Sequence, residues 1–343
     1  MSRSVSAPLP YPALHASHAG IWIATANGET RRVSRGDAIA LAAETPVILL
    51  NAPLVAARLG YGDLSGLDLL ELFAFLHPAR FMVPTIKGLA RITGLDVPRD
   101  ESGAAQMLQQ AAQVLLETAQ GEWPERDGAW TCAQALARLR WPWAPALADR
   151  LTPPGRDERW LFSKLPEWEE AAPRPAPRPV ELTQEEVIAR LGTLTGEGAE
   201  RREGQRAYAS AAMSAFAPRL AVDMPRLLLA EAGTGIGKTL GYLAPASLWA
   251  EKSGGPVWIS TYTKALQRQL TTETARIYGT DAAAKGRVVI RKGRENYLCL
   301  LNLEDALQGG FAGRAAIMAQ LVARWAAYSR DGDMVGGDLP GWL

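Results

Sequence analysis

Residues 226–239 read RLLLAEAGTGIGKT, an apolar run followed by a glycine-rich segment that ends in lysine and threonine. This segment departs from the phosphate-loop pattern G-x-x-x-x-G-K-[ST] at one position, because Ala232 replaces the first glycine. Glycines let backbone N–H groups converge on phosphate oxygens, and the helix that follows adds the positive end of its dipole. The stretch therefore predicts a nucleoside triphosphate site between a strand and a helix.

Two residues of this loop are expected to carry its chemistry. Lys238 would contact the β and γ phosphates, and Thr239 would ligate the Mg²⁺ that accompanies ATP. A glycine-rich turn that binds nothing is the alternative, but the patterns before and after the loop both favour the phosphate site. The nucleotide-binding candidates are Ala232, Gly233, Thr234, Gly235, Ile236, Gly237, Lys238 and Thr239.

The sequence around the loop alternates between strand and helix patterns. Apolar runs predict strands at 226–230, 256–261 and 287–292, and helical spacing fills 239–251 and 264–278. Such alternation favours parallel strands joined by right-handed crossovers. We therefore expect an α/β fold of the P-loop NTPase (RecA-like) type in this part of the chain.

A proline-rich stretch, AAPRPAPRPVE at 171–181, predicts an extended linker. The expected domains are then residues 1–170 and residues 182–343. Directly after the linker, Thr183 is expected to cap a helix, with Glu186 three positions later as its reciprocal partner.

The N-terminal part also mixes the two kinds of pattern. Apolar runs at 20–28 and 45–53 predict strands, and helical spacing appears at 68–76 and 104–120. The mixture predicts a second α/β domain.

Composition limits the classes of protein that fit. The chain has 343 residues and a net charge of +1, so two domains are expected and any nucleic-acid site must be local. Its two cysteines, Cys132 and Cys299, exclude a disulfide scaffold and favour a reducing compartment. No apolar run approaches the roughly 20 residues that span a bilayer, so we expect a cytoplasmic protein without a membrane partner.

Three further segments, in order around the phosphate loop, carry a family resemblance: RREGQRAYASAAM (201–213), WISTYTKALQRQL (258–270) and KGRENYLC (292–299). Together they resemble DinG-type helicases, the bacterial branch of the XPD-like iron–sulfur helicases of superfamily 2. The resemblance covers roughly 180–343 and includes the alanine at position 232. It implies an ATP-dependent DNA helicase that moves 5′ to 3′ along single-stranded DNA in DNA repair or replication.

The resemblance also implies roles for individual residues. Arg202 and Gln205 would read the adenine ring of ATP; for Gln205, an exposed polar helix residue is the alternative. Hydroxyl and amide groups near the start of the 264–278 helix would grip the backbone of single-stranded DNA, with an ordinary capped helix or a solvated turn as the alternative. The DNA-binding candidates are Ser260, Thr261, Thr263, Lys264, Gln267, Lys292 and Arg294, with Tyr297 as a stacking surface.

Cys299 matches the first of four ligands that hold a [4Fe–4S] cluster in this family. No cysteine follows it, so a cluster would require further cysteines beyond this chain. An acidic Walker B strand and a second motor domain are not found either, since LEDA at 303–306 follows no apolar strand. The expectation is therefore the N-terminal portion of a helicase. A non-hydrolysing ATP- and DNA-binding remnant and another phosphate-loop ATPase remain alternatives.

The N-terminal part resembles a DnaQ-like exonuclease of RNase H fold, in LLNAPLVAARLG (49–60) and in residues 67–95. Such a nuclease needs clustered carboxylates for two metal ions. The run at 20–28, taken as the first strand, has no aspartate, and Val55 stands where the resemblance predicts one. Asp68 is expected to cap a helix. The domain is therefore expected to be degenerate and non-catalytic.

Overall fold

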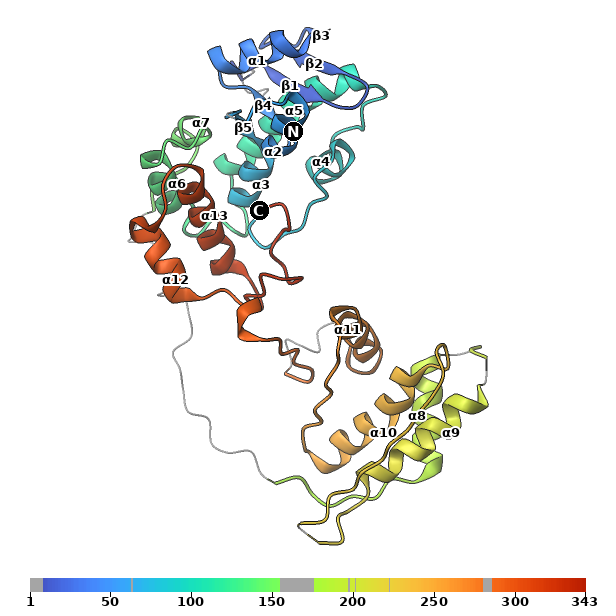
Figure 1. The fold of residues 1–343 in the computed structure, drawn as a ribbon. Helices are drawn as coiled ribbons and strands as arrows, with labels where there is room; N and C mark the ends of the chain where they lie inside the picture. Colours follow the sequence, from blue (N-terminus) through green and yellow to red (C-terminus); the bar gives the residue numbers. More distant parts are fainter. Residues whose placement is uncertain are drawn as a thin grey trace. The chain divides into compact units, whose positions relative to one another are not determined.

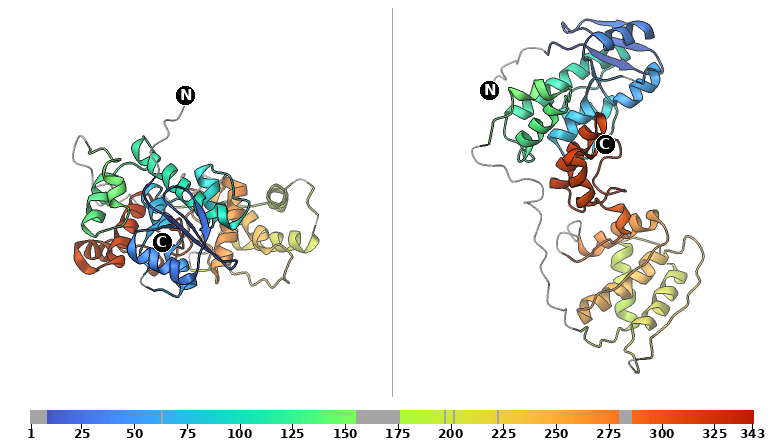
Figure 2. Two further views of the ribbon diagram at one scale, coloured as in Figure 1. Left: turned by 90° about the horizontal axis from the view of Figure 1, so that it is seen from above. Right: turned by 60° about the vertical axis from the view of Figure 1, so that its left-hand side comes forward.

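The chain forms two units, which the ribbon diagrams of the computed structural model display (Figures 1 and 2). The first unit combines Met1–Glu167 with Gly293–Leu343, and the second is Trp168–Lys292. The structure describes residues 9–62, 64–154, 176–196, 198–200, 202–221, 223–279 and 286–343.

The first unit contains a five-stranded mixed sheet in the order β3-β2-β1-β4-β5. The pairs β1–β2 and β2–β3 are antiparallel, while β1–β4 and β4–β5 are parallel. The strands are β1 (Ala13–Ala16), β2 (Ile21–Ala24), β3 (Thr30–Arg32), β4 (Ile48–Leu49) and β5 (Leu67–Asp68). The expected strands at 20–28 and 45–53 are thus confirmed as β2 and β4.

The sequence analysis missed β1, which reads ALHA and is the central strand of the sheet. Alanine and histidine have no strong strand preference, so the segment gives no local signal. Its strand conformation comes from pairing with β2 on one side and β4 on the other.

Helices cover both faces of this sheet because successive side chains of β1 point to opposite sides. Leu14 packs with α1 and α2, while Ala13 packs into the larger core that contains α3 and α5. The helices before residue 154 are α1 (Arg35–Glu44), α2 (Ala52–Leu59), α3 (Leu69–Leu76), α4 (Ile86–Thr93), α5 (Glu101–Gln120), α6 (Ala129–Arg138) and α7 (Ala144–Ala148). The expected helices at 68–76 and 104–120 are confirmed as α3 and α5.

The last fifty residues complete the core of the first unit. They form a 3₁₀ turn (Arg294–Asn296), α12 (Leu300–Asp305), a π turn (Ala306–Gly310) and α13 (Arg314–Tyr328). Ile317 and Leu321 of α13 belong to the same buried cluster as α3 and α5. Helix α13 contacts α3 and α6, and Figure 1 shows the three helices near one another.

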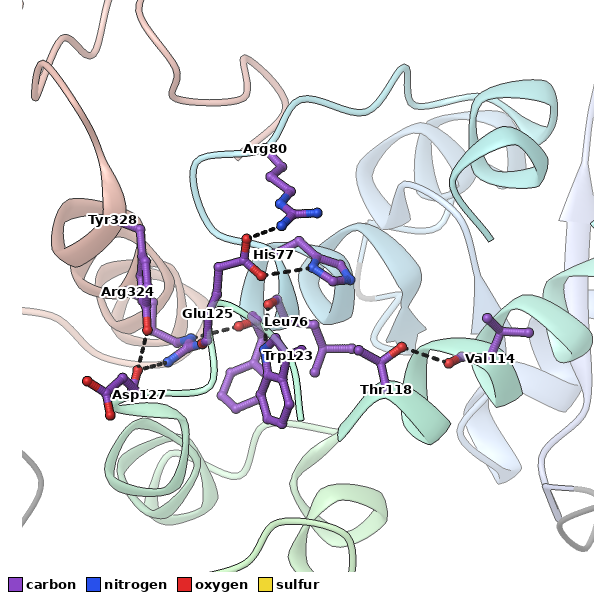
Figure 3. A network of polar contacts seen from close by, with 11 residues as sticks. Leu76, His77, Arg80, Val114, Thr118, Trp123, Glu125, Asp127, Arg324 and Tyr328 are labelled. Atoms are coloured by element: carbon purple, nitrogen blue, oxygen red, sulfur yellow. Dashed lines mark hydrogen bonds and ion pairs between the residues drawn. The ribbon is translucent and has the colours of Figure 1, made fainter. Parts of the chain in front are cut away.

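A buried arginine fixes this arrangement (Figure 3). Arg324 is only 4% exposed, and its guanidinium donates to the carbonyl oxygens of Phe75, Glu125 and Asp127 at 2.7, 2.6 and 3.2 Å. The indole of Trp342 donates to the carbonyl of Met82 at 2.9 Å. These contacts correct the expected boundary, which placed 182–343 in one domain. The sequence analysis predicted no helix at 314–328, so it did not anticipate that α13 would pack on the first unit.

The second unit is built on helices. These are α8 (Gln184–Thr195), α9 (Glu203–Met213), a 3₁₀ turn (Ser214–Phe216), α10 (Lys238–Ser253) and α11 (Lys264–Tyr278). Apolar residues of α8, α9 and α10 form its core. Thr183 caps α8, and the side chain of Glu186 accepts from the Thr183 backbone N–H, so the expected capping box is confirmed.

The three strands expected around the phosphate loop are wrong for the described residues. The segments 226–230, 256–261 and 287–292 pair with no strand, and their apolar side chains are open to solvent, with Leu229 88% and Trp258 79% exposed. A strand is stable only when neighbouring strands accept its backbone hydrogen bonds. An apolar run in the sequence favours an extended conformation, but it does not show whether neighbouring strands are present to pair with it. Among the described helices, none is long and apolar enough to cross a membrane.

Candidate nucleotide-binding site

The predicted phosphate loop leads directly into α10. Gly237 is the N-cap of this helix, with φ 85°, and Gly235 has φ 84°. Both values lie in the left-handed region, which glycine adopts without steric cost. Lys238 and Thr239 are consequently the first two residues of α10, where free backbone N–H groups and the helix dipole favour a bound phosphate.

The side chain of Lys238 turns back over the loop. Its ammonium group donates to the carbonyl oxygens of Ala232 and Gly233, at 2.8 and 2.9 Å. A bound phosphate would offer the same ammonium stronger, charged acceptors. The interaction with residue 232 uses its backbone carbonyl, so alanine at this position does not interfere with it.

Helix α9 supplies two side chains that hold the loop from the other side. Arg202 donates to the Gly235 carbonyl at 2.8 Å, and Gln205 donates to the Gly237 carbonyl at 2.9 Å. Gln205 is 6% exposed, so it is not a solvated surface residue. A Cβ added at Gly237 would collide with the Gln205 amide, which makes glycine obligatory here for a second reason. The structure thus brings both predicted adenine-reading residues to the phosphate loop.

The remaining loop residues occupy varied positions. The Thr239 hydroxyl is hydrogen-bonded to the phenol of Tyr242, whose pKa is raised by burial. Thr234 is exposed, whereas Ile236 is half-buried close to Gly204 of α9. The Thr239 hydroxyl at the helix start can serve as one Mg²⁺ ligand, with phosphate and water oxygens completing the shell. In the described parts of the chain, no three acidic, His or Cys side chains gather as a metal site.

The candidate DNA contacts lie before and at the start of α11. Thr263 caps this helix by accepting from the Leu266 N–H at 3.2 Å, as in the alternative of an ordinary capped helix. Ser260 is exposed and Gln267 is half-buried. The Thr261 hydroxyl is buried, and no partner for it lies within the described residues. Lys264 begins α11, and its side chain lies outside the described part of the structure.

The candidates at 292–299 are divided between the two units. Lys292 ends the second unit, and Arg294 belongs to the first. Tyr297 forms an isolated antiparallel bridge with Asp333. The predicted DNA-binding residues of this segment therefore do not all belong to one unit. The LEDA segment at 303–306 lies at the end of α12 rather than after a strand.

The two cysteines do not supply an iron–sulfur site in this chain. Cys299 is exposed just before α12, while Cys132 is buried and its thiol contacts the Gln320 carbonyl at 3.8 Å. A [4Fe–4S] cluster needs four thiolates, and the sequence contains two. The residues present therefore do not fit the cluster.

The first strand is β1 rather than 20–28, and its sequence ALHA contains no carboxylate. Val55 is buried in α2. Asp68 is confirmed as the cap of α3, where it also accepts from the backbone N–H groups of Asn51 and Ala52, and burial raises its pKa.

Curated relatives match part of the chain. Over 154 residues, the chain is 35% identical to the ATP-dependent DNA helicase YoaA of Haemophilus influenzae, covering 44% of this chain and 23% of that protein. Over 145 residues it is 38% identical to the 3′-5′ exonuclease DinG of Bacillus subtilis, covering 42% of this chain and 15% of that protein. The matched part of the chain is similar to ATP-dependent helicases of the DinG type.

A third relative agrees with this assignment. The ATP-dependent helicase DinG of Mycobacterium tuberculosis is 37% identical over 114 residues, which cover 32% of this chain and 16% of that protein. The chain thus matches less than a quarter of the length of each of these relatives. No protein-family model and no solved structure matches the chain.

Proposed function

We propose that residues 202–278 form the ATP-binding part of a DNA helicase motor. The observation that carries the proposal is the phosphate loop at the start of α10, with Lys238 across it and with Arg202 and Gln205 bonded to its carbonyl groups. In this proposal, two cations and a helix N-terminus would face the bound triphosphate. The relatives are named as ATP-dependent helicases, which favours ATP as the nucleotide.

ATP binding can be measured by equilibrium titration with a fluorescent ATP analogue and Mg²⁺. Lys238→Met is expected to weaken binding at least tenfold, because a charged contact to the phosphates is lost. Lys252→Met is the matched control, since Lys252 lies in the last turn of the same helix and pairs with Glu186. If both variants lose the same amount of ATP affinity, or if neither loses any, the assignment of Lys238 to the ATP site is refuted.

We propose single-stranded DNA as the partner of the segment 260–267, with 5′ to 3′ translocation and a role in DNA repair as the function of the complete motor. Backbone contacts release counterions, so DNA affinity should fall steeply with salt. The measurement is oligonucleotide anisotropy over a salt series, for the wild type and for Gln267→Ala. If the DNA affinity does not change with salt concentration, the proposed contacts of residues 260–267 with the DNA backbone are refuted. A DNA-stimulated ATPase assay then separates a motor from a remnant that only binds.

We also propose that the N-terminal part of the first unit is a non-catalytic relative of DnaQ-like exonucleases. Its support is the sheet order β3-β2-β1-β4-β5, in which three antiparallel strands are continued by two parallel ones, as expected of an RNase H fold. Nuclease assays with Mg²⁺ or Mn²⁺ on single-stranded DNA are expected to detect no cleavage. Since the relatives are bacterial helicases, we place the protein with the chromosome in the cytoplasm.

A further inference from the structure

Tyr242 lies three residues after Thr239 in α10, on the same face of the helix. Side chains on a helix lean toward its N-terminus, so the ring of Tyr242 points toward the end of α10 that carries the phosphate loop. Its phenol forms a hydrogen bond with the Thr239 hydroxyl. A residue outside the contiguous loop pattern thus contacts the hydroxyl that can serve as a Mg²⁺ ligand.

The core of the second unit holds the ring of Tyr242 in place. The ring is half-buried and packs against the apolar cluster that α8, α9 and α10 form. Tyr208 of α9 lies against the first turn of α10, where a Cβ added at Gly241 would come within 2.7 Å of its ring. This packing fixes the position of the phenol oxygen of Tyr242 before a nucleotide binds.

The phenol of Tyr242 is uncharged at neutral pH. Burial is the largest cause that raises its pKa, and the neighbouring Tyr208 adds to the increase, while the hydrogen bond with Thr239 acts in the opposite direction. A phenolate at this position would repel a triphosphate. A neutral phenol can accept a hydrogen bond without adding negative charge beside the phosphate loop.

The Thr239 hydroxyl needs an acceptor for its proton if its oxygen is to hold a metal ion. A hydroxyl has one proton and two lone pairs, and the proton must point away from a metal that one lone pair binds. Within a helix, a threonine hydroxyl can donate to the carbonyl four residues earlier. Because Thr239 is the second residue of α10, that carbonyl belongs to Gly235, which precedes the helix and accepts from Arg202. The phenol oxygen of Tyr242 provides another acceptor.

We propose that Tyr242 is a positioning residue for the Mg²⁺ that accompanies ATP. Its phenol oxygen accepts the Thr239 proton and thereby turns a lone pair of the Thr239 oxygen toward the metal. This inference rests on the proposed ATP site, where Thr239 would hold Mg²⁺ together with phosphate and water oxygens. Removal of a group that orients a metal ligand commonly weakens metal binding by about 10- to 100-fold.

The test measures binding of the fluorescent ATP analogue to the full-length protein over a series of Mg²⁺ concentrations and in EDTA. Tyr242→Phe keeps the packed ring and removes only the hydroxyl group. It should raise by about tenfold the Mg²⁺ concentration that gives half of the metal-dependent gain in affinity, and leave the affinity in EDTA unchanged. Tyr208→Phe is the matched control, because it removes a neighbouring phenol and keeps the bond between Tyr242 and Thr239.

A double variant shows whether Tyr242 acts through Thr239. Thr239→Ala alone should raise the Mg²⁺ requirement, and Tyr242→Phe added to it should have no further effect. A further increase in the double variant would mean that the phenol acts independently of Thr239, which would overturn the proposal.

Two other results would also overturn it. In the first, Tyr242→Phe has the Mg²⁺ requirement of the wild type, or the wild type binds ATP without regard to Mg²⁺. In the second, Tyr242→Phe weakens binding equally in EDTA and in Mg²⁺, which indicates a role in packing alone. A wild type that binds ATP under neither condition refutes the proposed ATP site itself, so the two kinds of failure are distinguishable.

Discussion

Glu71 offers a quantitative test of how α13 packs on the first unit. Its side chain is buried in α3, where it accepts from the indole of Trp141 and pairs with Arg314 of α13, both at 2.8 Å. The pKa of Glu71 is raised from 4.5 to about 7. Burial is the largest cause, and the nearby carboxyl group of Asp68 is the second. The attraction of Arg314 and the hydrogen bond from Trp141 act in the opposite direction.

The sign follows from proton binding. Because the pKa of Glu71 is higher in the folded state, folding takes up a proton between about pH 4.5 and pH 7. The contribution of Glu71 to stability is therefore least favourable above pH 7, and it improves as the pH falls toward 4.5. At about 1.4 kcal/mol per pH unit, the difference between 4.5 and about 7 corresponds to about 3 kcal/mol.

Glu71→Gln should remove this penalty, because the amide is neutral at every pH and still accepts from Trp141. Urea unfolding is expected to find the variant more stable than the wild type above pH 7, by up to about 3 kcal/mol, and similar to it near pH 4.5. Glu44→Gln, at an exposed position, is the control and should shift neither value. A variant that is less stable above pH 7 would mean that the Arg314 ion pair outweighs burial, and would refute the reasoning.

Three further changes probe the other contacts. Arg324→Met leaves three carbonyl groups without their donor and should lower the free energy of unfolding by about 3 kcal/mol in urea titrations; a loss below about 1 kcal/mol would contradict the role given to this residue. Gly237→Ala should lower ATP affinity at least tenfold because its methyl group meets the Gln205 amide, whereas Gly254→Ala, with a similar left-handed φ but open space, should not. Thr183→Ala removes the cap of α8 and should cost about 1 kcal/mol in thermal unfolding; an unchanged midpoint would deny the capping box a role.

The elements that the sequence predicted correctly are those whose conformation depends on residues close together in the chain. The spacing of apolar residues at 104–120 indicated α5, and the pair Thr183 and Glu186 indicated the start of α8, because cap and helix involve neighbours in sequence. β1 escaped notice because ALHA becomes a strand only through its partners on both sides. The strands expected at 226–230 and 256–261 failed for the converse reason, since they have the composition of strands and lack the partners.

The candidate site was predicted in the same uneven way. The glycines and Lys238 follow from a contiguous pattern, and the structure places them at a helix start as that pattern requires. Arg202 and Gln205 came from a family resemblance alone. Their contacts with the carbonyls of Gly235 and Gly237 join positions more than thirty residues apart, which no local pattern specifies.

The guanidinium of Arg324 and the carbonyl of Phe75 form a hydrogen bond although they lie 249 residues apart in the sequence. This separation affects how the chain folds while it is being synthesised. At about 5–20 residues per second, roughly 10–50 s pass between the synthesis of the two residues. During that interval α3 has emerged without the helix that covers it, while the phosphate-loop unit is translated in full. The later unit can therefore finish folding before the earlier one. The nascent chain should bind chaperones until α13 has been synthesised.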